Sequence, residues 1–196
     1  MQNAFDRLVA MIGLVLLSPV FAVIGVAIKR DSPGPVLFTQ ERVGRFGKPF
    51  TLFKFRTMVV DSGKGLAVTA AGDARVTRVG TKLRSTKLDE LPQLMNVAKG
   101  EMALVGPRPE VRDYVDLWTE QQRQVILSVR PGITDPMTVR LRREEELLGT
   151  AADPERYYRQ VLLPQKAHAY ADYVQQRSLV GDLRLVLVTL KSIVRD

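Results

Sequence analysis

The sequence predicts a mainly helical α+β fold, and three patterns lead to this prediction. Residues 8–28 form a run of 21 uncharged, largely apolar residues. Residues 88–100, and much of the chain after residue 110, carry apolar residues at helical spacing. Two short strands at 36–40 and 49–55 flank a turn that contains glycine, which is typical of a β-hairpin. We therefore expect helices to form most of the fold, with one small hairpin between them.

The apolar N-terminal run allows three interpretations. Residues 8–28 are long enough to cross a bilayer as one helix, which takes about 20 residues. A signal peptide is the weakest interpretation, because the run leads straight into Lys29-Arg30 without a clear cleavage site. A re-entrant hairpin is suggested by Ser18 and Pro19, because proline removes a backbone hydrogen bond and the serine hydroxyl can bond the carbonyl left over. Taken alone, these residues favour the spanning helix, because prolines are common in membrane helices.

Composition excludes several kinds of site. The 196 residues include no cysteine, so disulfides, thiolate zinc sites and cysteine nucleophiles are excluded. His168 is the only histidine, which argues against a histidine-based triad or a multi-histidine metal site. We interpret it as a packing or surface residue. Any catalytic acid, base or nucleophile must come from Asp, Glu, Lys, Ser, Thr or Tyr.

Positive charge is concentrated in residues 40–87. This segment has eleven basic and three acidic residues, and the difference of +8 equals the net charge of the whole chain. Such a segment attracts an anionic partner, which can be a phosphorylated substrate, an anionic lipid or a nucleic acid. The alternative is a solvated basic face without a partner. Residues 59–76, rich in Gly, Ala and Thr, predict a mobile loop near a ligand.

An acid pair, Asp89 and Glu90, stands where a helix is predicted to start. Pro92 fits only in the first helical turn, so Asp89 should lie at or near the N-cap, with Gly100 just past the helix end. A carboxylate at an N-cap faces the positive end of the helix dipole and should stay ionised. The apolar residues at helical spacing in this stretch are Leu91, Leu94, Met95 and Ala98.

Basic residues flank this acid pair in the sequence. Arg84 and Lys87 precede it, and Arg108 follows it between two prolines. Fixed cations around an ionised acid pair suit a metal-bound phosphate ester. The alternative is an ordinary acidic helix cap without a ligand.

The second half of the chain predicts further helices. Residues 110–128 and 140–148 are expected to be helical, and Asp153-Pro154 begins a helix that Pro164 ends or kinks. Residues 182–196 carry an apolar and a basic stripe, which fits a core-facing helix as well as a helix in a membrane interface. We favour the interface, because the chain already contains an apolar N-terminal run.

Five motifs follow one another along the chain. They are Asp31-Ser-Pro-Gly-Pro-Val, Gln40-Glu-Arg-Val-Gly44, Lys54-Phe-Arg-Thr-Met58, Leu88-Asp-Glu-Leu-Pro-Gln93 and Gly106-Pro-Arg-Pro109. In this order they resemble the motifs of the bacterial sugar transferases, which are monotopic polyprenyl-phosphate phosphoglycosyl transferases. The resemblance is good over residues 1 to about 135 and loose beyond.

The resemblance implies a specific reaction. It implies a membrane enzyme that moves a sugar 1-phosphate from a UDP-sugar to undecaprenyl phosphate and releases UMP, as the first membrane step of a bacterial glycan or glycoconjugate pathway. Asp89 matches the nucleophile, which would form an aspartyl phosphosugar, and Glu90 matches its neighbour at a Mg²⁺ site. Both are expected to bind the metal. The residues expected to contact substrate phosphate are Arg84, Arg108, Lys54 and Arg56.

The resemblance also implies how the chain is organised. Residues 8–28 would form a re-entrant hairpin broken at Ser18-Pro19, which replaces the spanning helix favoured above. Residues 1–30 would be the membrane hairpin, and residues 31–196 a catalytic domain on the cytoplasmic face of the bacterial inner membrane, containing the β-hairpin, the catalytic helices and interfacial amphipathic helices. Expected partners are the UDP-sugar, polyprenyl phosphate and bilayer lipids but no nucleic acid, and a homodimer stays open. The chain looks like a minimal catalytic unit.

One position departs from the family pattern. Thr134-Asp135 stands where the family usually has Thr-Gly after Pro-Gly-Ile. Asp135 is therefore expected to alter the nucleotide or sugar pocket, or to mark a subgroup.

Two other classes of function compete with the enzyme. A membrane-tethered nucleic-acid binder would account for the basic segment through phosphate contacts, but it needs neither the acid pair nor Arg108. A membrane scaffold without catalysis would use the amphipathic C-terminal helix. The five motifs together favour the enzyme.

Overall fold

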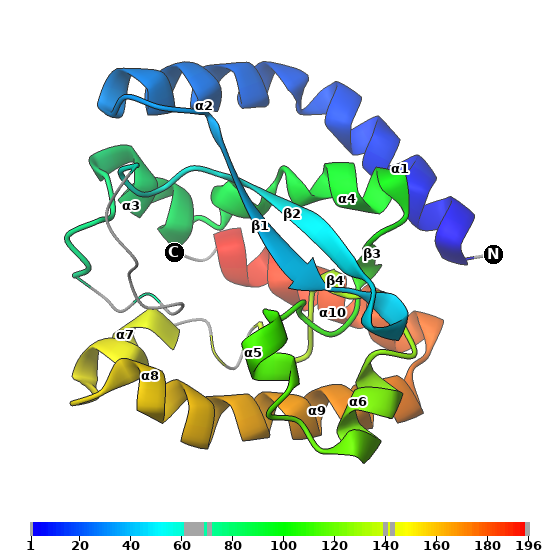
Figure 1. The fold of residues 1–196 in the computed structure, drawn as a ribbon. Helices are drawn as coiled ribbons and strands as arrows, with labels where there is room; N and C mark the ends of the chain where they lie inside the picture. Colours follow the sequence, from blue (N-terminus) through cyan, green and yellow to red (C-terminus); the bar gives the residue numbers. More distant parts are fainter. Residues whose placement is uncertain (1, 61–68, 70–71, 139–140, 142–143, 195–196) are drawn as a thin grey trace. The chain divides into compact units, whose positions relative to one another are not determined.

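The fold is mainly helical with two small sheets. A computed structural model describes residues 2–60, 69, 72–138, 141 and 144–194 (Figure 1). Helices account for 59% of it. Within these ranges there are two sheets of two strands each, β1–β2 and β3–β4. The predicted α+β, mainly helical class is confirmed, while the second sheet was not predicted.

The elements follow one another along the chain in an order that Figure 1 labels. They are α1 (Gln2–Leu16), α2 (Ser18–Asp31), β1 (Leu37–Val43), β2 (Pro49–Phe55), α3 (Arg78–Ser85), α4 (Gln93–Lys99), β3 (Ala103–Val105), α5 (Arg112–Val115), α6 (Glu120–Ile126), β4 (Gly132–Thr134), α7 (Glu144–Thr150), α8 (Pro154–Tyr157), α9 (Leu163–Gln176) and α10 (Leu179–Val194).

The chain divides into two compact units. Unit 1 comprises Met1–Glu41, Thr51–Gly65 and Gly72–Met102, and unit 2 comprises Arg42–Phe50, Leu66–Ala71 and Ala103–Asp196. The hairpin strands β1 and β2 run through both units, and this hairpin confirms the predicted one. The domain boundary predicted after residue 30 stays a prediction.

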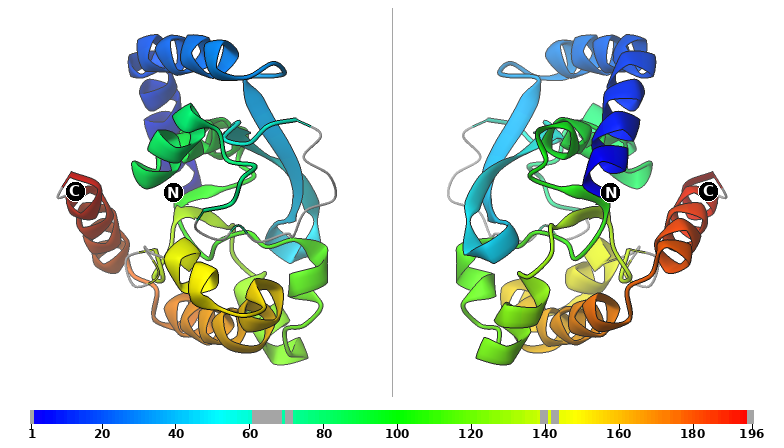
Figure 2. Two further views of the ribbon diagram at one scale, coloured as in Figure 1. Left: turned by 90° about the vertical axis from the view of Figure 1, so that its left-hand side faces the viewer. Right: turned by 90° about the vertical axis from the view of Figure 1, so that its right-hand side faces the viewer.

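Unit 1 begins with two helices that meet at a bend. α1 and α2 are inclined by 61° at a break next to Pro19 (Figure 2). Proline has no N–H for the carbonyl of Val15, and the hydroxyl of Ser18 donates to that carbonyl instead, at 2.8 Å. Of the helices described, none is by itself long and apolar enough to cross a membrane. The two helices of this bent pair reach that length and hydropathy only together. The single straight helix favoured by the residues alone does not form.

The helix predicted at the acid pair begins later than expected. Asp89 lies in a 3₁₀ turn, Leu88–Glu90, and α4 starts only at Gln93, with Pro92 at its N-cap. Hydrogen bonds at this turn reach back three residues, so it is tighter than an α-helix, and Pro92 has no N–H with which to continue it into α4. The predicted N-cap position of Asp89 is therefore wrong. Gly100 ends α4 with a φ of +84°, as expected for a glycine C-cap.

A small apolar core organises unit 1. It consists of Ile24 and Ile28 from α2, Phe55 from β2 and Leu83 from α3, all buried. α1 packs against α4. The core thus ties the segments on either side of the acid pair to the bent N-terminal helices.

Unit 2 has the larger core. The segment predicted as one helix over residues 110–128 is two helices, α5 and α6, because Thr119 starts a new helix with a capping box that Gln122 completes. Tyr114, Val115 and Trp118 are nevertheless buried in this core. The helix predicted to begin at Asp153-Pro154 is confirmed, in three consecutive pieces. These are α8, a π-helical turn at Tyr158–Leu162 and α9, whose first turn holds Pro164. His168 is exposed, as expected.

Two predicted segments fall partly outside the described residues. Most of the loop predicted at 59–76 lies there. The second segment is the helix predicted at 140–148, because residues 139–140 and 142–143 also lie outside the described residues. The described part of the second segment forms α7.

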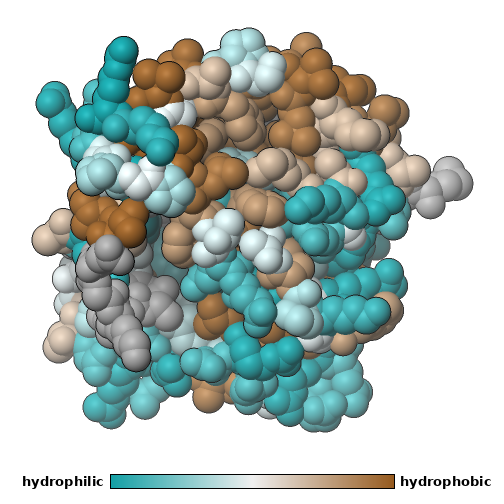
Figure 3. Space-filling model, turned by 45° about the horizontal axis from the view of Figure 1, so that its top comes forward, coloured by the Kyte–Doolittle hydropathy of each residue, from teal (hydrophilic) through white to brown (hydrophobic). Residues whose placement is uncertain are grey.

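Two helical faces of the chain expose apolar side chains. Figure 3 shows them gathered along α1 and α2. In α10 the exposed side chains that the structure describes are mostly apolar, with Arg184 and Lys191 as charged exceptions, while Asp182 and Thr189 are buried. Asp182 accepts hydrogen bonds from the Tyr173 hydroxyl at 2.6 Å and from Arg177 Nε at 3.3 Å, so these bonds hold its carboxylate on the inner side of α10. The exposed apolar residues of these helices include Phe5, Leu8, Ile12, Val15, Leu16, Val23, Val26, Leu179, Val180, Leu183, Leu187 and Val188.

Candidate active site

Asp89 is a buried acid of unit 1, with 8% of its surface exposed. Burial raises the pKa of its carboxyl group, and the neighbouring carboxylate of Glu90 raises it further. The ammonium of Lys54 is the strongest influence that lowers this pKa, ahead of Lys87 and Arg84. Ionisation of Asp89 therefore depends on nearby cations. At the predicted N-cap position it would have depended on the helix dipole instead.

Lys54 pairs with one of the two acids, Glu90. From β2, its Nζ donates to Oε1 of Glu90 at 3.1 Å, and both side chains are largely buried, with 20% and 13% exposed. A charged hydrogen bond at this depth is stronger than one on the surface. The strand thus sets one positive charge beside the two adjacent carboxylates.

Arg84 reaches the same region from α3. Its Nη1 makes a long hydrogen bond of 3.5 Å to the hydroxyl of Thr57. The backbone carbonyl of Thr57 also accepts from Thr77 N at 2.9 Å, and the Thr77 hydroxyl caps the helix by accepting from Gly80 N at 3.0 Å. A side chain at Gly80 would collide with the backbone of Thr57. This close packing fixes α3, and with it Arg84, against the segment after β2.

Arg56 is buried and faces a turn. Its Nε donates to the Pro35 carbonyl at 2.6 Å, and its Nη1 donates to the Pro33 carbonyl at 2.8 Å. The hydroxyl and carbonyl of Ser32 accept two further bonds, at 2.8 and 2.9 Å. These contacts give Arg56 a structural role at residues 32–35. The phosphate contact expected of it stays a prediction.

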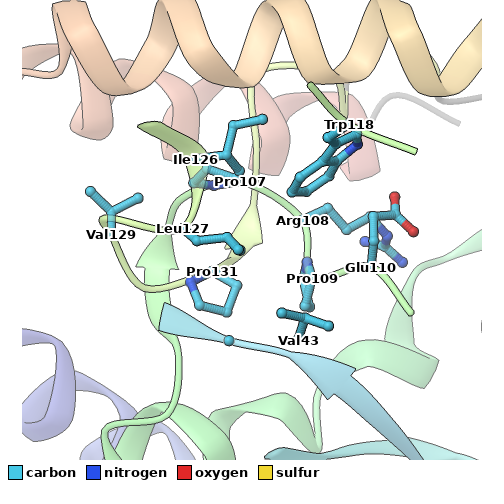
Figure 4. Close-up of a pocket in the computed structure, with 11 residues that line it drawn as sticks. Val43, Pro107, Arg108, Pro109, Glu110, Trp118, Ile126, Leu127, Val129 and Pro131 are labelled. Carbon is cyan, nitrogen blue, oxygen red and sulfur yellow. The ribbon is translucent and has the colours of Figure 1, made fainter. Parts of the chain in front are cut away.

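Arg108 belongs to unit 2. It follows β3, and Figure 4 shows it with Glu110 and Trp118 at a small pocket. The pocket has room for about one water molecule. The structure therefore gathers Lys54, Arg84, Asp89 and Glu90 within unit 1, while the phosphate-binding role of Arg108 stays a prediction.

A chain of buried polar contacts in unit 2 was not predicted from the sequence. Arg42 pairs with Glu110 at 3.5 Å, and the Tyr158 hydroxyl donates to Glu110 at 2.8 Å. Lys166 donates to that hydroxyl at 3.2 Å and pairs with Glu144 at 2.7 Å. One signal was present in the sequence: Lys166 stands among the apolar positions of α9, which are Leu163, Ala167 and Tyr170.

The acid pair fits a magnesium ion that is shared with substrate. Among the described residues, no group of three acidic, histidine or cysteine side chains forms a metal site. Mg²⁺ in phosphate-transfer sites is, however, commonly held by one or two carboxylates together with substrate phosphates. Asp89 and Glu90 supply two, and a carboxylate has enough lone pairs to accept from Lys54 and also bind a cation.

Replacing Lys54 with methionine should shift the pH dependence of catalysis. Without the ammonium, the pKa of Asp89 rises further, so the carboxylate form is lost at a higher pH and the acid limb of kcat/KM moves to higher pH. We expect kcat/KM at pH 7 to fall by roughly tenfold or more, the cost of losing a charged hydrogen bond. The measurement is the pH profile of turnover of the substrate that the family resemblance implies, a UDP-sugar.

Two variants control for this effect. Lys54→Arg keeps the charge and should leave the acid limb near its wild-type position. Lys82→Met removes an exposed lysine of α3 and should change neither limb. An acid limb that stays in place in Lys54→Met would contradict the assigned influence of Lys54 on Asp89.

The chain matches the bacterial sugar transferase family over residues 1–196. It is 38% identical over 195 residues to the UDP-glucose:undecaprenyl-phosphate glucose-1-phosphate transferase of Caulobacter vibrioides, covering 98% of this chain and 69% of that protein. It is 44% identical over 139 residues to the UDP-N-acetylgalactosamine-undecaprenyl-phosphate N-acetylgalactosaminephosphotransferase of Aeromonas hydrophila, covering 68% of this chain and 32% of that protein.

A third relative matches over nearly its whole length. An exopolysaccharide production protein of Rhizobium leguminosarum is 35% identical over 203 residues, covering 98% of this chain and 94% of that protein. The match covers less than two thirds of the Bacillus subtilis, Aeromonas hydrophila and Escherichia coli proteins. The family match extends over all 196 residues, and the chain belongs to the bacterial sugar transferase family.

Proposed function

We propose that the chain transfers a sugar 1-phosphate from a UDP-sugar to undecaprenyl phosphate and releases UMP. The observation that carries this proposal is the buried carboxylate of Asp89 beside Lys54, Glu90 and Arg84, in a member of this family. The relatives from Caulobacter and Aeromonas are named for this type of reaction.

The reaction proceeds in two displacements. Asp89 Oδ attacks the β-phosphorus of the UDP-sugar, the bond from that phosphorus to the bridging oxygen breaks, and UMP leaves. An oxygen of undecaprenyl phosphate then attacks the phosphorus of the aspartyl phosphosugar, which releases the Asp89 carboxylate and leaves the sugar on a lipid diphosphate. A covalent intermediate splits one difficult displacement into two easier ones. No net proton is gained or lost.

The cations of the site oppose charge on the phosphates. Lys54 lowers the pKa of Asp89 and so favours the carboxylate that attacks, and Arg84 contributes positive charge to the same region. Arg108 binds phosphoryl oxygens through its planar guanidinium. Asp89 and Glu90 would hold Mg²⁺, which would neutralise charge on the diphosphate.

The apolar surfaces seat the enzyme on the membrane. The bent α1–α2 pair enters the bilayer as a re-entrant hairpin, and the exposed apolar face of α10 lies in the interface. The catalytic residues then face the cytoplasm, where a soluble UDP-sugar meets the phosphate of a lipid at the surface of the inner membrane.

Cysteine labelling tests the membrane topology. Because the chain has no cysteine, single variants at exposed positions at the two ends of the helix pair, Asn3→Cys and Arg30→Cys, can be labelled without background. A re-entrant hairpin predicts that an impermeant maleimide labels both positions in inverted membrane vesicles and neither in intact spheroplasts. A Ser178→Cys variant, exposed before α10, marks the cytoplasmic side. Labelling of Asn3→Cys and Arg30→Cys from opposite sides would contradict the hairpin.

The activity is tested with the purified protein in detergent. We expect UMP release from at least one UDP-sugar, such as UDP-glucose or UDP-N-acetylgalactosamine, when Mg²⁺ and undecaprenyl phosphate are present. Without the lipid, intact-mass spectrometry should detect an adduct of one phosphosugar. UMP release without any adduct would favour direct attack by the lipid phosphate. Salt-dependent DNA binding without turnover of any UDP-sugar would favour a nucleic-acid binder.

A further inference from the structure

We propose that Asn96 is a positioning residue for Lys54, because its side-chain amide holds the strand that carries Lys54 against the helix that follows the acid pair. The inference rests on the proposed function, in which Lys54 pairs with Glu90 and favours attack by Asp89. All of these residues belong to unit 1. In this role Asn96 contacts no substrate and acts on catalysis only through the strand.

The side chain of Asn96 is a fully buried amide on α4. Its Oδ1 accepts from Phe53 N at 3.2 Å, and its Nδ2 donates to the Thr51 carbonyl at 2.7 Å and to Glu101 Oε2 at 2.8 Å. A buried amide costs free energy unless its donors and its acceptor are paired, and here they are. A backbone N–H can only donate and a carbonyl can only accept, so these partners fix which end of the amide faces which.

The amide takes the place of a neighbouring strand. Among the described residues, β2 has one strand partner, β1. The Thr51 carbonyl and Phe53 N lie on one edge of β2, on either side of Leu52. A residue of a parallel strand bonds in the same way to the two residues that flank its partner. Asn96 therefore pairs opposite Leu52 and sets the register of this edge against α4.

The helix that carries Asn96 is joined to the acid pair by backbone hydrogen bonds. Glu90 ends the 3₁₀ turn, in which Leu91 N donates to the Leu88 carbonyl at 3.2 Å. Leu94 N then donates to the Leu91 carbonyl at 3.0 Å, inside α4. Because these bonds run from the turn into the helix, the positions of Glu90 and Asn96 are coupled.

Lys54 directly follows the strand residue that Asn96 holds. Its Nζ reaches Glu90 at 3.1 Å, so β2 meets this part of the chain at two points, one through its backbone and one through the ammonium. Lys99 Nζ also lies 4.4 Å from the centroid of the Phe53 ring, but this contact lacks the directionality of a hydrogen bond. A shift of about 1 Å at a catalytic group can lower a rate about 100-fold, so the register set by Asn96 matters for Lys54.

A double-mutant cycle tests the inference. Asn96→Leu keeps a buried side chain of similar size and removes both bonds to β2. We expect it to lower kcat/KM for UMP release by about tenfold in the wild-type background and by less than about twofold in the Lys54→Met background, where no ammonium is left to position. In the wild-type background the loss should appear in the rate of adduct formation at saturating UDP-sugar, without lipid.

Two further variants separate positioning from stability. Val97→Ala removes buried apolar volume from the same helix and leaves the amide in place, so it should lower Tm but change kcat/KM by less than about twofold. Asn96→Asp keeps an acceptor for Phe53 N, but its carboxylate has no N–H for the Thr51 carbonyl. Its loss of kcat/KM should therefore be smaller than that of Asn96→Leu and should again require Lys54. Thermal unfolding of every variant is measured by circular dichroism.

Several results would overturn the inference. One is an equal loss of kcat/KM in the wild-type and Lys54→Met backgrounds, which would indicate a general structural effect. Others are a loss in Val97→Ala as large as that in Asn96→Leu, and an unchanged kcat/KM in both Asn96 variants. If Asn96→Leu does not fold, Asn96→Asp carries the same comparison. Absence of UMP release by the wild-type enzyme would instead overturn the proposed function, and the inference with it.

Discussion

Asp89→Asn should abolish the phosphosugar adduct and reduce UMP release by about 10⁴-fold or more. The amide has nearly the shape of the carboxylate but is not a competent nucleophile, and removing a nucleophile costs enzymes on the order of 10⁴- to 10⁶-fold in kcat. The adduct is measured by intact-mass spectrometry in the absence of lipid, and turnover is measured by UMP release. Burial of Asp89 makes a fold control necessary, which a thermal unfolding curve provides.

Asp116→Asn is the matched control for this change. Asp116 is exposed, and the same substitution there should leave both adduct and turnover unchanged. Full activity in Asp89→Asn would refute the nucleophile assignment. A variant that retains turnover but forms no adduct would show that the lipid phosphate attacks the UDP-sugar directly.

Arg56→Leu should destabilise the protein by about 3–5 kcal/mol. Arg56 donates four hydrogen bonds to residues 32–35, and its loss leaves three carbonyl groups and a hydroxyl without that donor, each at a cost of about 1–3 kcal/mol where it is buried. Prolines at 33 and 35 have no N–H, so this turn cannot replace the bonds with its own backbone. For a chain of this size the expected fall in Tm is roughly 10 °C, measured by far-ultraviolet circular dichroism.

Two comparisons separate this structural role from a phosphate contact. Arg78→Leu, at an exposed arginine of the same unit, should change Tm by less than about 2 °C. Arg56→Lys should lie between wild type and Arg56→Leu, because an ammonium cannot reproduce the planar fork. An unchanged Tm with a raised KM for the UDP-sugar in Arg56→Leu would support the phosphate contact predicted from sequence and contradict the structural role.

Local features of the fold were predictable because nearby residues decide them. The break between α1 and α2 was one of the alternatives that Ser18 and Pro19 left open, and in it the Ser18 hydroxyl bonds the Val15 carbonyl. The end of α4 at Gly100 follows from the ability of glycine to adopt a positive φ. The start of α4 was not predictable in the same way, because an acid pair followed by proline is compatible both with an N-cap and with a preceding 3₁₀ turn.

By itself the sequence determined the helical class, the hairpin and the motifs that contain Asp89, Glu90 and Arg108, because these depend on residues close together in the chain. At Ser18-Pro19 the residues alone favoured a straight helix, and the structure shows the break. Only the tertiary structure decided how charges are paired. Lys54 and Glu90, 36 positions apart, meet because β2 and the 3₁₀ turn belong to one unit. The segments that carry Arg108 and Asp135 lie next to each other because two short strands, separated by two helices, pair in parallel. Such contacts depend on which distant segments pack together, and no local pattern encodes that choice.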